Sequence, residues 1–429
     1  MKKIEEMSRE ELLKEKQELE AAYKDFESQG LKLNMARGKP SLEQLNLSFP
    51  MMDVMNSYNG MAAEDGTDCR NYGEIEGIEE ARRLIAEIMD TTPDHVICFG
   101  NSSLNVMYDM VARAMTHGVC GSTPWMKLPE VKFLCPVPGY DRHFAITEFF
   151  GIKMINIPMT PNGPDMDLVE QYVSSDPLIK GIWCVPKFSN PEGVIYSDET
   201  VMRFANLRPA AEDFRIFWDN AYSVHYLYDD IKPQIPDLVR ECQKAGNPDL
   251  VYKFASTSKI TFPGSGISGM AVSKRNRDSI LEMLKIQTIG PDKVNQLRHV
   301  RFLKDRAGVE EQMKKHAAIL RPKFEIVEKI VDSALTHRGI GSFLKPLGGY
   351  FISYNAPEGT AKRIVQLAKD CGVTMTGAGA PFPYHKDPKD SVIRIAPSFP
   401  PLEELEKAAQ IFAICVKIAA IEKAIGKAR

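Results

Sequence analysis

The sequence has few of the features of secreted, zinc-binding or membrane proteins. Its 429 residues include only 8 cysteines; none forms a CxxC pair and none has a histidine at ligand spacing, so no metal site is expected. No apolar run approaches the length needed to cross a bilayer, and the charged start, MKKIEEMSREELLKEKQELE, lacks the apolar core of a signal peptide. We therefore expect a cytoplasmic protein with reduced thiols.

The chain also lacks an excess of charge of one sign. It has 54 basic and 57 acidic side chains, a net charge of -3, so nothing in the charge balance favours binding to nucleic acid or to an anionic membrane. Small anionic substrates remain possible, because they respond to local charge. A chain of 429 residues is too long to fold around one simple hydrophobic core, so its length indicates two domains.

Short apolar runs alternate with helical stretches through the middle of the chain. They are HVICF (95–99), VKFLCPV (131–137), KMINIPM (153–159), IKGIWCV (179–185), FRIFWDN (214–220) and LVYKFAS (250–256). Continuous apolar strands between helices predict an α/β fold with a largely parallel sheet covered on both faces. The next run, GMAVS (269–273), follows too closely for a helical crossover and is expected to be antiparallel.

Both ends of the chain have a different pattern. Ser8 and Glu11 form a capping box that predicts a helix ending near Gly30. From about Val294 the chain becomes helical, and its last part mixes strands (GYFISYN, VIRIAP) with a long C-terminal helix. This pattern indicates a second, smaller α+β domain.

The segment FASTSKITFPGSGISG (254–269) carries the first candidate for chemistry. A strand runs into three hydroxyl residues and Lys259, followed by a glycine-rich loop, where hydroxyls and free backbone N–H groups could hold a phosphate. A lysine beside bound phosphate is placed to form an imine with an aldehyde cofactor. Taken alone, Lys259 is more often a solvated loop lysine.

Two further polar segments follow predicted strands. In DNAY (219–222), Asp219 could pair with a protonated pyridine nitrogen and Tyr222 with a ring oxygen, although Asp219 could equally cap a helix. In SNPEG (189–193), Asn190 could bind the same oxygen, although Asn-Pro is first of all a turn signal.

Three more segments are compatible with the same chemistry. GNSSL (100–104) precedes a helix and forms an anion site or an ordinary cap. Tyr140, at the end of CPVPGY, could stack on a planar cofactor or simply lie at a domain seam. Arg394 lies within an apolar strand and needs an anionic partner, which is either a substrate carboxylate or a structural ion pair.

Taken together and in this order, these segments resemble the fold-type I aminotransferases, which depend on pyridoxal 5'-phosphate. The resemblance covers nearly the whole chain and rests on NMARGKP (34–40), NYGEIEGIEEAR (71–82), GNSSL, PVPGY, SNPEG, DNAY, STSK, LGGYFIS (347–353) and VIRIAPSF. It implies a large cofactor-binding domain, residues 49–317, and a small domain built from residues 1–48 and 318–429.

The resemblance also implies a role for each matching residue. Lys259 corresponds to the Schiff-base lysine that moves the substrate proton, and Asp219 to the partner of the pyridinium nitrogen. Asn190 and Tyr222 correspond to the pair on the ring oxygen, and Tyr140 to the ring-stacking residue. The segments that bind phosphate contain Ser102, Ser103, Ser256 and Ser258.

The implied substrate and subunit contacts involve three more residues. Arg394 corresponds to the arginine that grips the substrate α-carboxylate, with Gly38 beside it. Tyr72 corresponds to a tyrosine that reaches the phosphate of a neighbouring subunit, which implies a homodimer.

One departure from the family pattern narrows the resemblance. Ile267 stands where common members have a phosphate-binding arginine. With NMARGKP, IGPDKVNQLRH (289–299) and HAAILRPKF (316–324), this points to a bacterial subgroup of aspartate aminotransferases, acting on aspartate and 2-oxoglutarate by a ping-pong mechanism. Arg142, and after it Arg37, are candidates for binding the side-chain carboxylate, although either could form a surface ion pair.

The same fold and cofactor also serve other reactions. A lyase or decarboxylase, or an aminotransferase for alanine, kynurenine or an aromatic amino acid, would share these motifs. A cofactor-binding regulator usually has a DNA-binding domain ahead of the fold, whereas only a charged helix precedes NMARGKP here.

Overall fold

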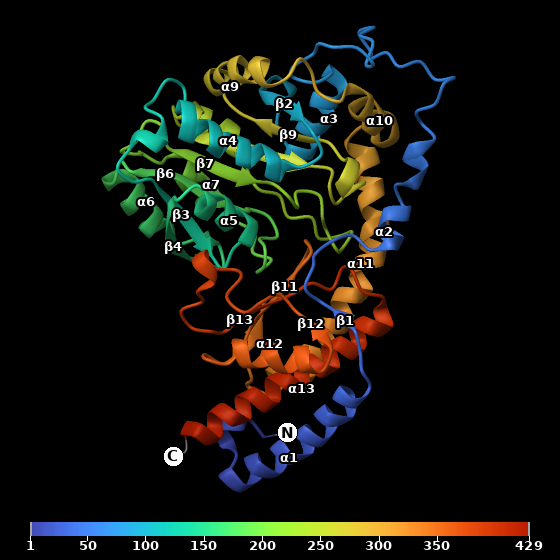
Figure 1. The fold of residues 1–429 in the computed structure, drawn as a ribbon, viewed down its shortest axis with the longest axis vertical. Coiled ribbons are helices and arrows are strands. Elements are labelled where there is room, and N and C mark those ends of the chain that lie inside the picture. The colour runs from blue at the N-terminus through green and yellow to red at the C-terminus, as the bar shows by residue number, and fades with distance from the viewer. Residues whose placement is uncertain (1, 428–429) are drawn as a thin grey trace.

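The computed structural model describes residues 2–427, and its largest element is a mixed eight-stranded sheet (Figure 1). The strand order is β2-β9-β8-β7-β6-β3-β4-β5. The strands are β2 (Val96–Phe99), β3 (Lys132–Val137), β4 (Lys153–Thr160), β5 (Gly163–Pro164), β6 (Ile179–Cys184), β7 (Arg215–Asp219), β8 (Val251–Ser256) and β9 (Ser268–Ala271). From β8 to β4 neighbours are parallel, whereas β9 is antiparallel to β8. The strands and the reversal expected from the sequence are confirmed.

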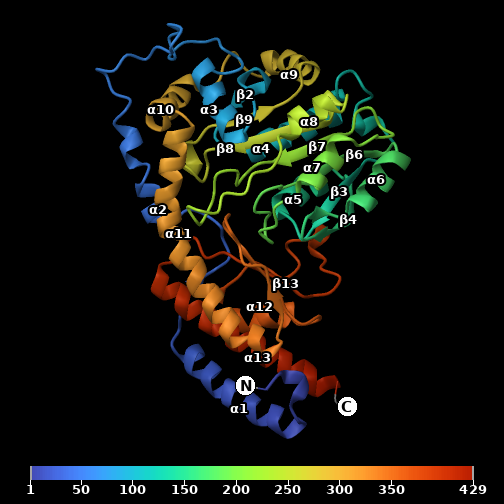
Figure 2. The same ribbon diagram turned by 180° about the vertical axis from the view of Figure 1, so that it is seen from behind.

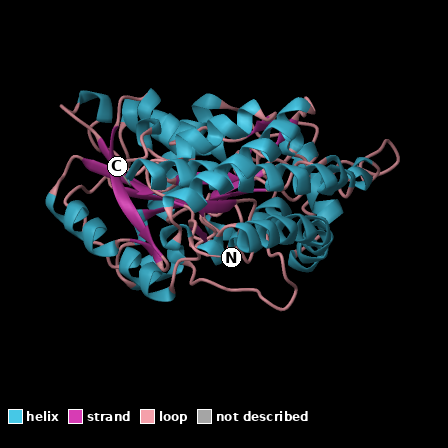
Figure 3. Cartoon of the chain, turned by 90° about the horizontal axis from the view of Figure 1, so that it is seen from below, coloured by secondary structure: helices cyan, strands magenta, loops and turns pink. Residues whose placement is uncertain are grey.

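Helices cover both faces of this sheet, as the view from below shows (Figure 3). They are α3 (Glu79–Met89), α4 (Ser103–His117), α5 (Asp141–Phe149), α6 (Met166–Ser175), α7 (Asp198–Ala205), α8 (Leu238–Lys244), α9 (Lys274–Gln287) and α10 (Lys293–Leu303). Alternate residues of β7 belong to different hydrophobic cores. Ile216 and Trp218 pack in one core, and Phe217 packs in the other. Burial on both faces explains why the strands have continuous apolar runs.

A second, smaller layer lies below the large sheet in Figures 1 and 2. Its antiparallel sheet contains β10 (Ser342–Phe343), β11 (Ile352–Asn355) and β13 (Val392–Ile395), in that order. The helices beside it are α12 (Ala361–Asp370) and α13 (Leu402–Lys427). The predicted α+β character of this part is confirmed.

The two ends of the chain meet in this smaller layer. β1 (Leu33–Asn34) pairs in parallel with β12 (Val373–Thr374), and the capped helix α1 (Arg9–Ser28) lies along α13. The Tyr23 hydroxyl of α1 donates to the Leu367 carbonyl of α12, 3.0 Å away. The short helix α2 (Leu42–Asn46) then leads towards the large sheet.

One long helix, α11 (Arg306–Ala334), connects the two parts. Val309 and Met313 join a core of the large sheet, whereas Leu320 and Phe324 join the core of the small one. The predicted boundary between residues 317 and 318 falls inside this helix, and the division into two domains at residues 48 and 317 stays a prediction. Within residues 2–427 no helix is long and apolar enough to cross a membrane.

Candidate active site

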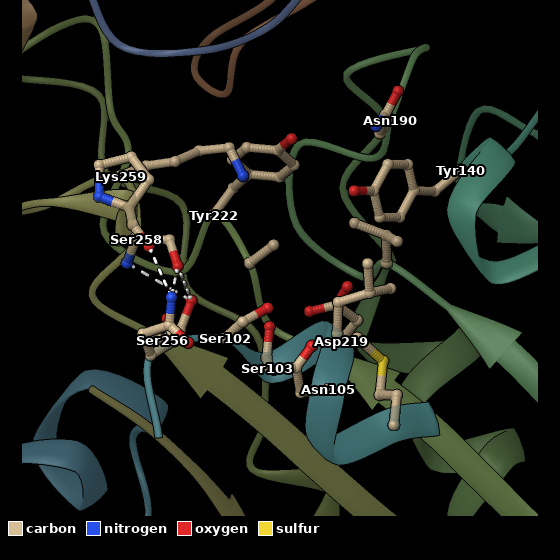
Figure 4. Close-up of a pocket in the computed structure, with 16 residues that line it drawn as sticks. Ser102, Ser103, Asn105, Tyr140, Asn190, Asp219, Tyr222, Ser256, Ser258 and Lys259 are labelled. Atoms are coloured by element: carbon tan, nitrogen blue, oxygen red, sulfur yellow. Dashed lines mark hydrogen bonds between the residues drawn. The ribbon is translucent and has the colours of Figure 1, made fainter. Parts of the chain in front are cut away.

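A pocket of about 400 Å³ opens where β6, β7 and β8 end, beside the start of α4 (Figure 4). Ligands of α/β proteins bind at this carboxyl edge of the sheet. Its lining comprises Asn101, Ser102, Ser103, Leu104, Asn105, Met107, Tyr140, Val185, Asn190, Asp219, Ala221, Tyr222, Ser256, Ser258, Lys259 and Pro263. Nine of the residues predicted from sequence therefore lie around one cavity. The described residues contain no group of three or more His, Cys, Asp or Glu that could hold a metal ion.

Lys259 lies in the turn that follows β8. The Ser258 hydroxyl donates to the backbone carbonyl of Asn101, 3.1 Å away, which ties this turn to the loop before α4. Lys259 Nζ lies 5.0 Å from the centre of the Tyr222 ring. Burial lowers the pKa of the Lys259 amine below its usual value, and the charge of Asp219 opposes that shift. A larger share of neutral amine suits a nucleophile or general base.

Buried polar side chains hold the backbone immediately after Lys259. The Ile260 carbonyl lies 3.0 Å from Nε2 of His316, and Gln44 bridges the other ring nitrogen of His316 (3.1 Å) and the Tyr350 hydroxyl (2.9 Å). Burial lowers the pKa of His316 to about 4, which keeps its ring neutral at pH 7. His316 and Tyr350 lie within the motifs HAAILRPKF and LGGYFIS, but these motifs predicted no role for them, and Gln44 lies in no motif.

Asp219 ends β7 and points into the pocket (Figure 4). Its Oδ2 lies 3.0 Å from Nε2 of His143, whereas its buried Oδ1 has no hydrogen-bond partner among residues 2–427. Buried carboxylate oxygens are normally paired, so this free oxygen fits a protonated ring nitrogen. The alternative role of Asp219 as a helix cap is wrong, because a turn follows the strand.

His143 is a site residue that the sequence motifs did not identify. Its ring is 1% exposed and stacks on Trp183, with ring centres 4.5 Å apart. It lies one helical turn after Tyr140, at the start of α5, and that spacing was the available signal. The sequence motifs also did not identify Asn105, which lies in the first turn of α4 and lines the pocket.

Three polar side chains converge on the other side of the pocket. Burial raises the pKa of Tyr140 to about 12 and that of Tyr222 well above its usual value, so both hydroxyls are protonated at pH 7 and able to donate. The Asn190 side-chain oxygen accepts a hydrogen bond from Arg394 Nη1 at 3.3 Å, which leaves its amide N–H groups to donate into the pocket.

The four predicted serines gather at one end of the pocket, near the start of α4. Ser102 caps α4 without using its side chain, and the hydroxyls of Ser256 and Ser258 are 3.0 Å apart. Hydroxyls and the free N–H groups of a helix N-terminus are suitable partners for a phosphate. Ile267, which stands where the family has an arginine, is 1% exposed and does not line the pocket, whereas the serine hydroxyls do. The residues present therefore fit pyridoxal 5'-phosphate, the cofactor that the family resemblance implies.

Arg394 lies on β13 just beyond the pocket lining. It is 7% exposed, and its Nη1 donates to Asp141 Oδ1 at 2.7 Å as well as to Asn190. Gly38 packs against the Phe351 ring so closely that a Cβ atom would overlap it. Phe351 also lies under the Arg394 guanidinium, 5.0 Å from ring centre to Cζ, so Gly38 and Arg394 share one neighbour.

Three predicted residues lie away from the cavity. Tyr72 is 76% exposed, and Arg142 and Arg37 are exposed as well. None of the three lines the pocket. Their proposed contacts with a neighbouring subunit or a substrate side chain stay predictions.

Comparison with known proteins agrees with this geometry. Residues 7–428 match the aspartate amino-transferase family. The chain is 44% identical to an aspartate aminotransferase of Corynebacterium glutamicum over 95% of its own length and 94% of the relative's. The crystal structure of an aspartate transaminase from C. glutamicum has a TM-score of 0.95 at 43% identity, covering 98% of this chain and 99% of that one.

A distant solved structure shows the fold alone. The α-aminoadipate aminotransferase of Thermus thermophilus, complexed with N-(5'-phosphopyridoxyl)-L-leucine, has a TM-score of 0.72 at 17% identity and covers 91% of this chain and 93% of that one. The sheet, the pocket at its carboxyl edge and the near relatives agree, and the expected fold class and enzyme class are confirmed. The chain is an aminotransferase that belongs to the aspartate amino-transferase family.

Proposed function

We propose that this aminotransferase binds pyridoxal 5'-phosphate at Lys259 and moves the α-amino group of aspartate to 2-oxoglutarate. The observation that carries the proposal is the meeting of Lys259 Nζ and the unpaired Oδ1 of Asp219 in one pocket. An amine and a carboxylate at opposite sides of a cavity suit the two ends of an aldehyde-bearing pyridine ring. The relatives that are aspartate aminotransferases by name support the choice of substrate.

Different residues of the pocket would hold different parts of this cofactor. Bound pyridoxal 5'-phosphate supplies an aldehyde that forms an imine with amines and a ring that accepts the electron pair of the substrate Cα–H bond. Asp219 would hold the ring nitrogen in its protonated form. Asn190 and Tyr222 would donate to the ring oxygen, Tyr140 would stack on the ring, and the serines at the start of α4 and after β8 would bind phosphate.

Lys259 also acts on the proton of the substrate. Its amine, once released from the cofactor, takes the proton from the substrate α-carbon as general base. The lowered pKa of the buried amine supports that role, because the neutral form is the one that accepts a proton. Two successive half-reactions through one site lead to ping-pong kinetics.

The substrate carboxylates require cations. Arg394 presents a planar guanidinium beside Asn190, which supports its assignment to the α-carboxylate. Aspartate has a second carboxylate, and we assign it to Arg142, or failing that to Arg37; both are exposed. Gly38 would pass the backbone close to the α-carboxylate.

We also propose that the enzyme is a cytoplasmic homodimer. Tyr72 lies in a bend, and the N–H of the next residue, Gly73, donates to the Ile289 carbonyl at 3.3 Å. Ile289 is 62% exposed, and four other apolar side chains are exposed as well: Leu42, Phe49, Met52 and Ile286. Covering them with a second copy would remove apolar surface from water. The eight cysteines are free thiols, which suits a reducing compartment.

An absorption spectrum of the purified protein tests the cofactor and the substrate together. We expect a cofactor band that shifts when aspartate alone is added and returns when 2-oxoglutarate follows, and no such cycle in Lys259→Ala. A band that aspartate leaves unchanged would overturn the aspartate assignment. No band after adding pyridoxal 5'-phosphate would overturn the cofactor assignment, and product release without an oxo acid would favour a lyase or decarboxylase.

A further inference from the structure

The cation assigned to the substrate α-carboxylate already binds a carboxylate of the protein. Arg394 Nη1 donates to Asp141 Oδ1 at 2.7 Å, and the Arg394 side chain is only 8% exposed. A guanidinium buried to this degree needs a negative partner, because desolvation of an unpaired charge is costly. Asp141 supplies that partner when no ligand is present.

The pair joins two parts of the molecule. Asp141 is the first residue of α5, which covers the large sheet, whereas Arg394 lies on β13 of the small sheet. Within residues 2–427, the Asp141 carboxylate makes no other side-chain hydrogen bond, and its side chain is 26% exposed. Asp141 therefore has room to turn towards solvent when another anion arrives.

Only Nη2 of the Arg394 guanidinium has no hydrogen-bond partner among residues 2–427. Its Nη1 is shared by Asp141 and Asn190, and its Nε is 3.4 Å from the Thr376 hydroxyl. A bidentate carboxylate needs two parallel N–H groups of one guanidinium. Two carboxylates at one guanidinium also repel each other at short range. A substrate α-carboxylate can therefore form a fork only by adding an N–H group of Nη1 or Nε to those of Nη2, and at Nη1 it meets the negative charge of Asp141.

We propose that Asp141 is a resident carboxylate that competes with the substrate α-carboxylate for Arg394 and so sets the affinity of the site. The inference rests on the assignment of Arg394 to that carboxylate in the proposed function. Replacing one carboxylate by another on the same guanidinium gains little net free energy. A ligand must therefore bind through its remaining groups, and the pair weakens binding of every carboxylate ligand.

Succinate is a suitable probe, because it has two carboxylates and no amino group to react. Its affinity for the cofactor-loaded enzyme is measured by calorimetry, for the wild type, Asp141→Asn and Asp141→Ser. We expect both variants to bind succinate about tenfold more tightly, the scale of one lost hydrogen bond to a charged group. Asp141→Glu keeps the competing charge and is expected to bind like the wild type.

A matched control removes a carboxylate from an arginine pair elsewhere. Glu170 Oε1 accepts from Arg203 Nε at 2.7 Å on the outer helices, and Glu170→Gln is expected to leave succinate affinity unchanged.

Steady-state kinetics add a second readout. Without Asp141, KM for both the amino acid and the oxo acid falls by a similar factor while kcat stays within about twofold, as expected when uniform binding improves.

The double variant separates this inference from the proposed function. In an Arg394→Gln background, Asp141→Asn is expected to have no effect on succinate affinity, because nothing remains to compete for. If Asp141→Asn and Asp141→Ser bind succinate as weakly as the wild type or more weakly, while Arg394→Gln loses affinity, the competition is overturned and the role of Arg394 stands. If Arg394→Gln binds succinate unchanged, the role of Arg394 itself is overturned.

Discussion

The proposed cofactor half of the site and its proposed substrate half are built differently. Lys259, Asp219 and the serines come from strand ends of one sheet and from the helix beside it, and Asp219 is 3% exposed. The proposed substrate half takes Arg394 from the other sheet and Arg142 from the surface. Hydrogen bonds between the strands of one sheet fix the relative positions of the side chains on it. The relative positions of side chains on two sheets depend on how the two sheets pack against each other. The proposed cofactor contacts therefore depend on one sheet, and the proposed substrate contacts on two.

The largest effect is expected from Lys259→Ala in the cofactor half. Loss of the general base should slow conversion of aspartate on the order of 10⁴-fold, measured by rapid-mixing absorption in a single turnover. Lys274→Ala, on the surface helix α9, is the control and should keep the wild-type rate. A Lys259→Ala enzyme that retains more than a hundredth of the rate would remove this lysine from the mechanism.

Asp219→Asn tests the same half with a change of charge alone. We expect kcat to fall on the order of 10²- to 10³-fold with little change in KM, because a preorganised charge at the ring nitrogen is lost. His143→Asn, which leaves that charge in place, should cost on the order of tenfold. Equal losses in the two variants would mean that orientation, and not charge, is what Asp219 provides.

His316 should make the cofactor half sensitive to acid. Its folded pKa of about 4 lies below the ordinary 6.5, so the unfolded chain takes up the proton first as pH falls. The contribution of the neutral His316 ring to the free energy of unfolding is fully present above pH 6.5 and is lost as the pH falls towards 4. A shift of that size corresponds to at most roughly 3 kcal/mol of unfolding free energy.

Urea unfolding at pH 7 and pH 4.5 measures this loss. His316→Gln keeps a hydrogen-bonding group beside Ile260 but cannot gain the proton, so its stability should fall less between the two pH values than that of the wild type. His337→Gln, with an exposed side chain, should behave like the wild type. Identical acid losses in His316→Gln and the wild type would contradict the burial argument.

The smallest effect is expected in the substrate half, from Arg142→Ala. An exposed ion pair contributes up to about 1 kcal/mol, so KM for aspartate should rise at most about fivefold while KM for alanine stays unchanged. Arg37→Ala in the same assay tests the second candidate. A rise in KM confined to Arg37→Ala would transfer the side-chain contact to that residue.

Local patterns predicted much of the fold. Each apolar run of the middle segment became a strand, because a strand buried on both faces has a continuous apolar sequence. The capping box at Ser8 and Glu11 begins α1, since its hydrogen bonds lie within one turn. Motifs at strand ends placed Lys259, Asp219, Tyr222 and Asn190 around one pocket, because parallel strands present their carboxyl ends at one edge.

The elements, the family resemblance and the main pocket residues could be predicted before folding was considered, because these depend on neighbours within a few positions. Which distant side chains meet could be seen only in the folded chain. His143 and Asp219 are 76 positions apart, Asp141 and Arg394 are 253 apart, and Gln44 and His316 are 272 apart. Such pairs have no periodic signal, since they depend on how strands and helices pack after the chain has folded. The balance of charge around Lys259 and Arg394 follows from that packing.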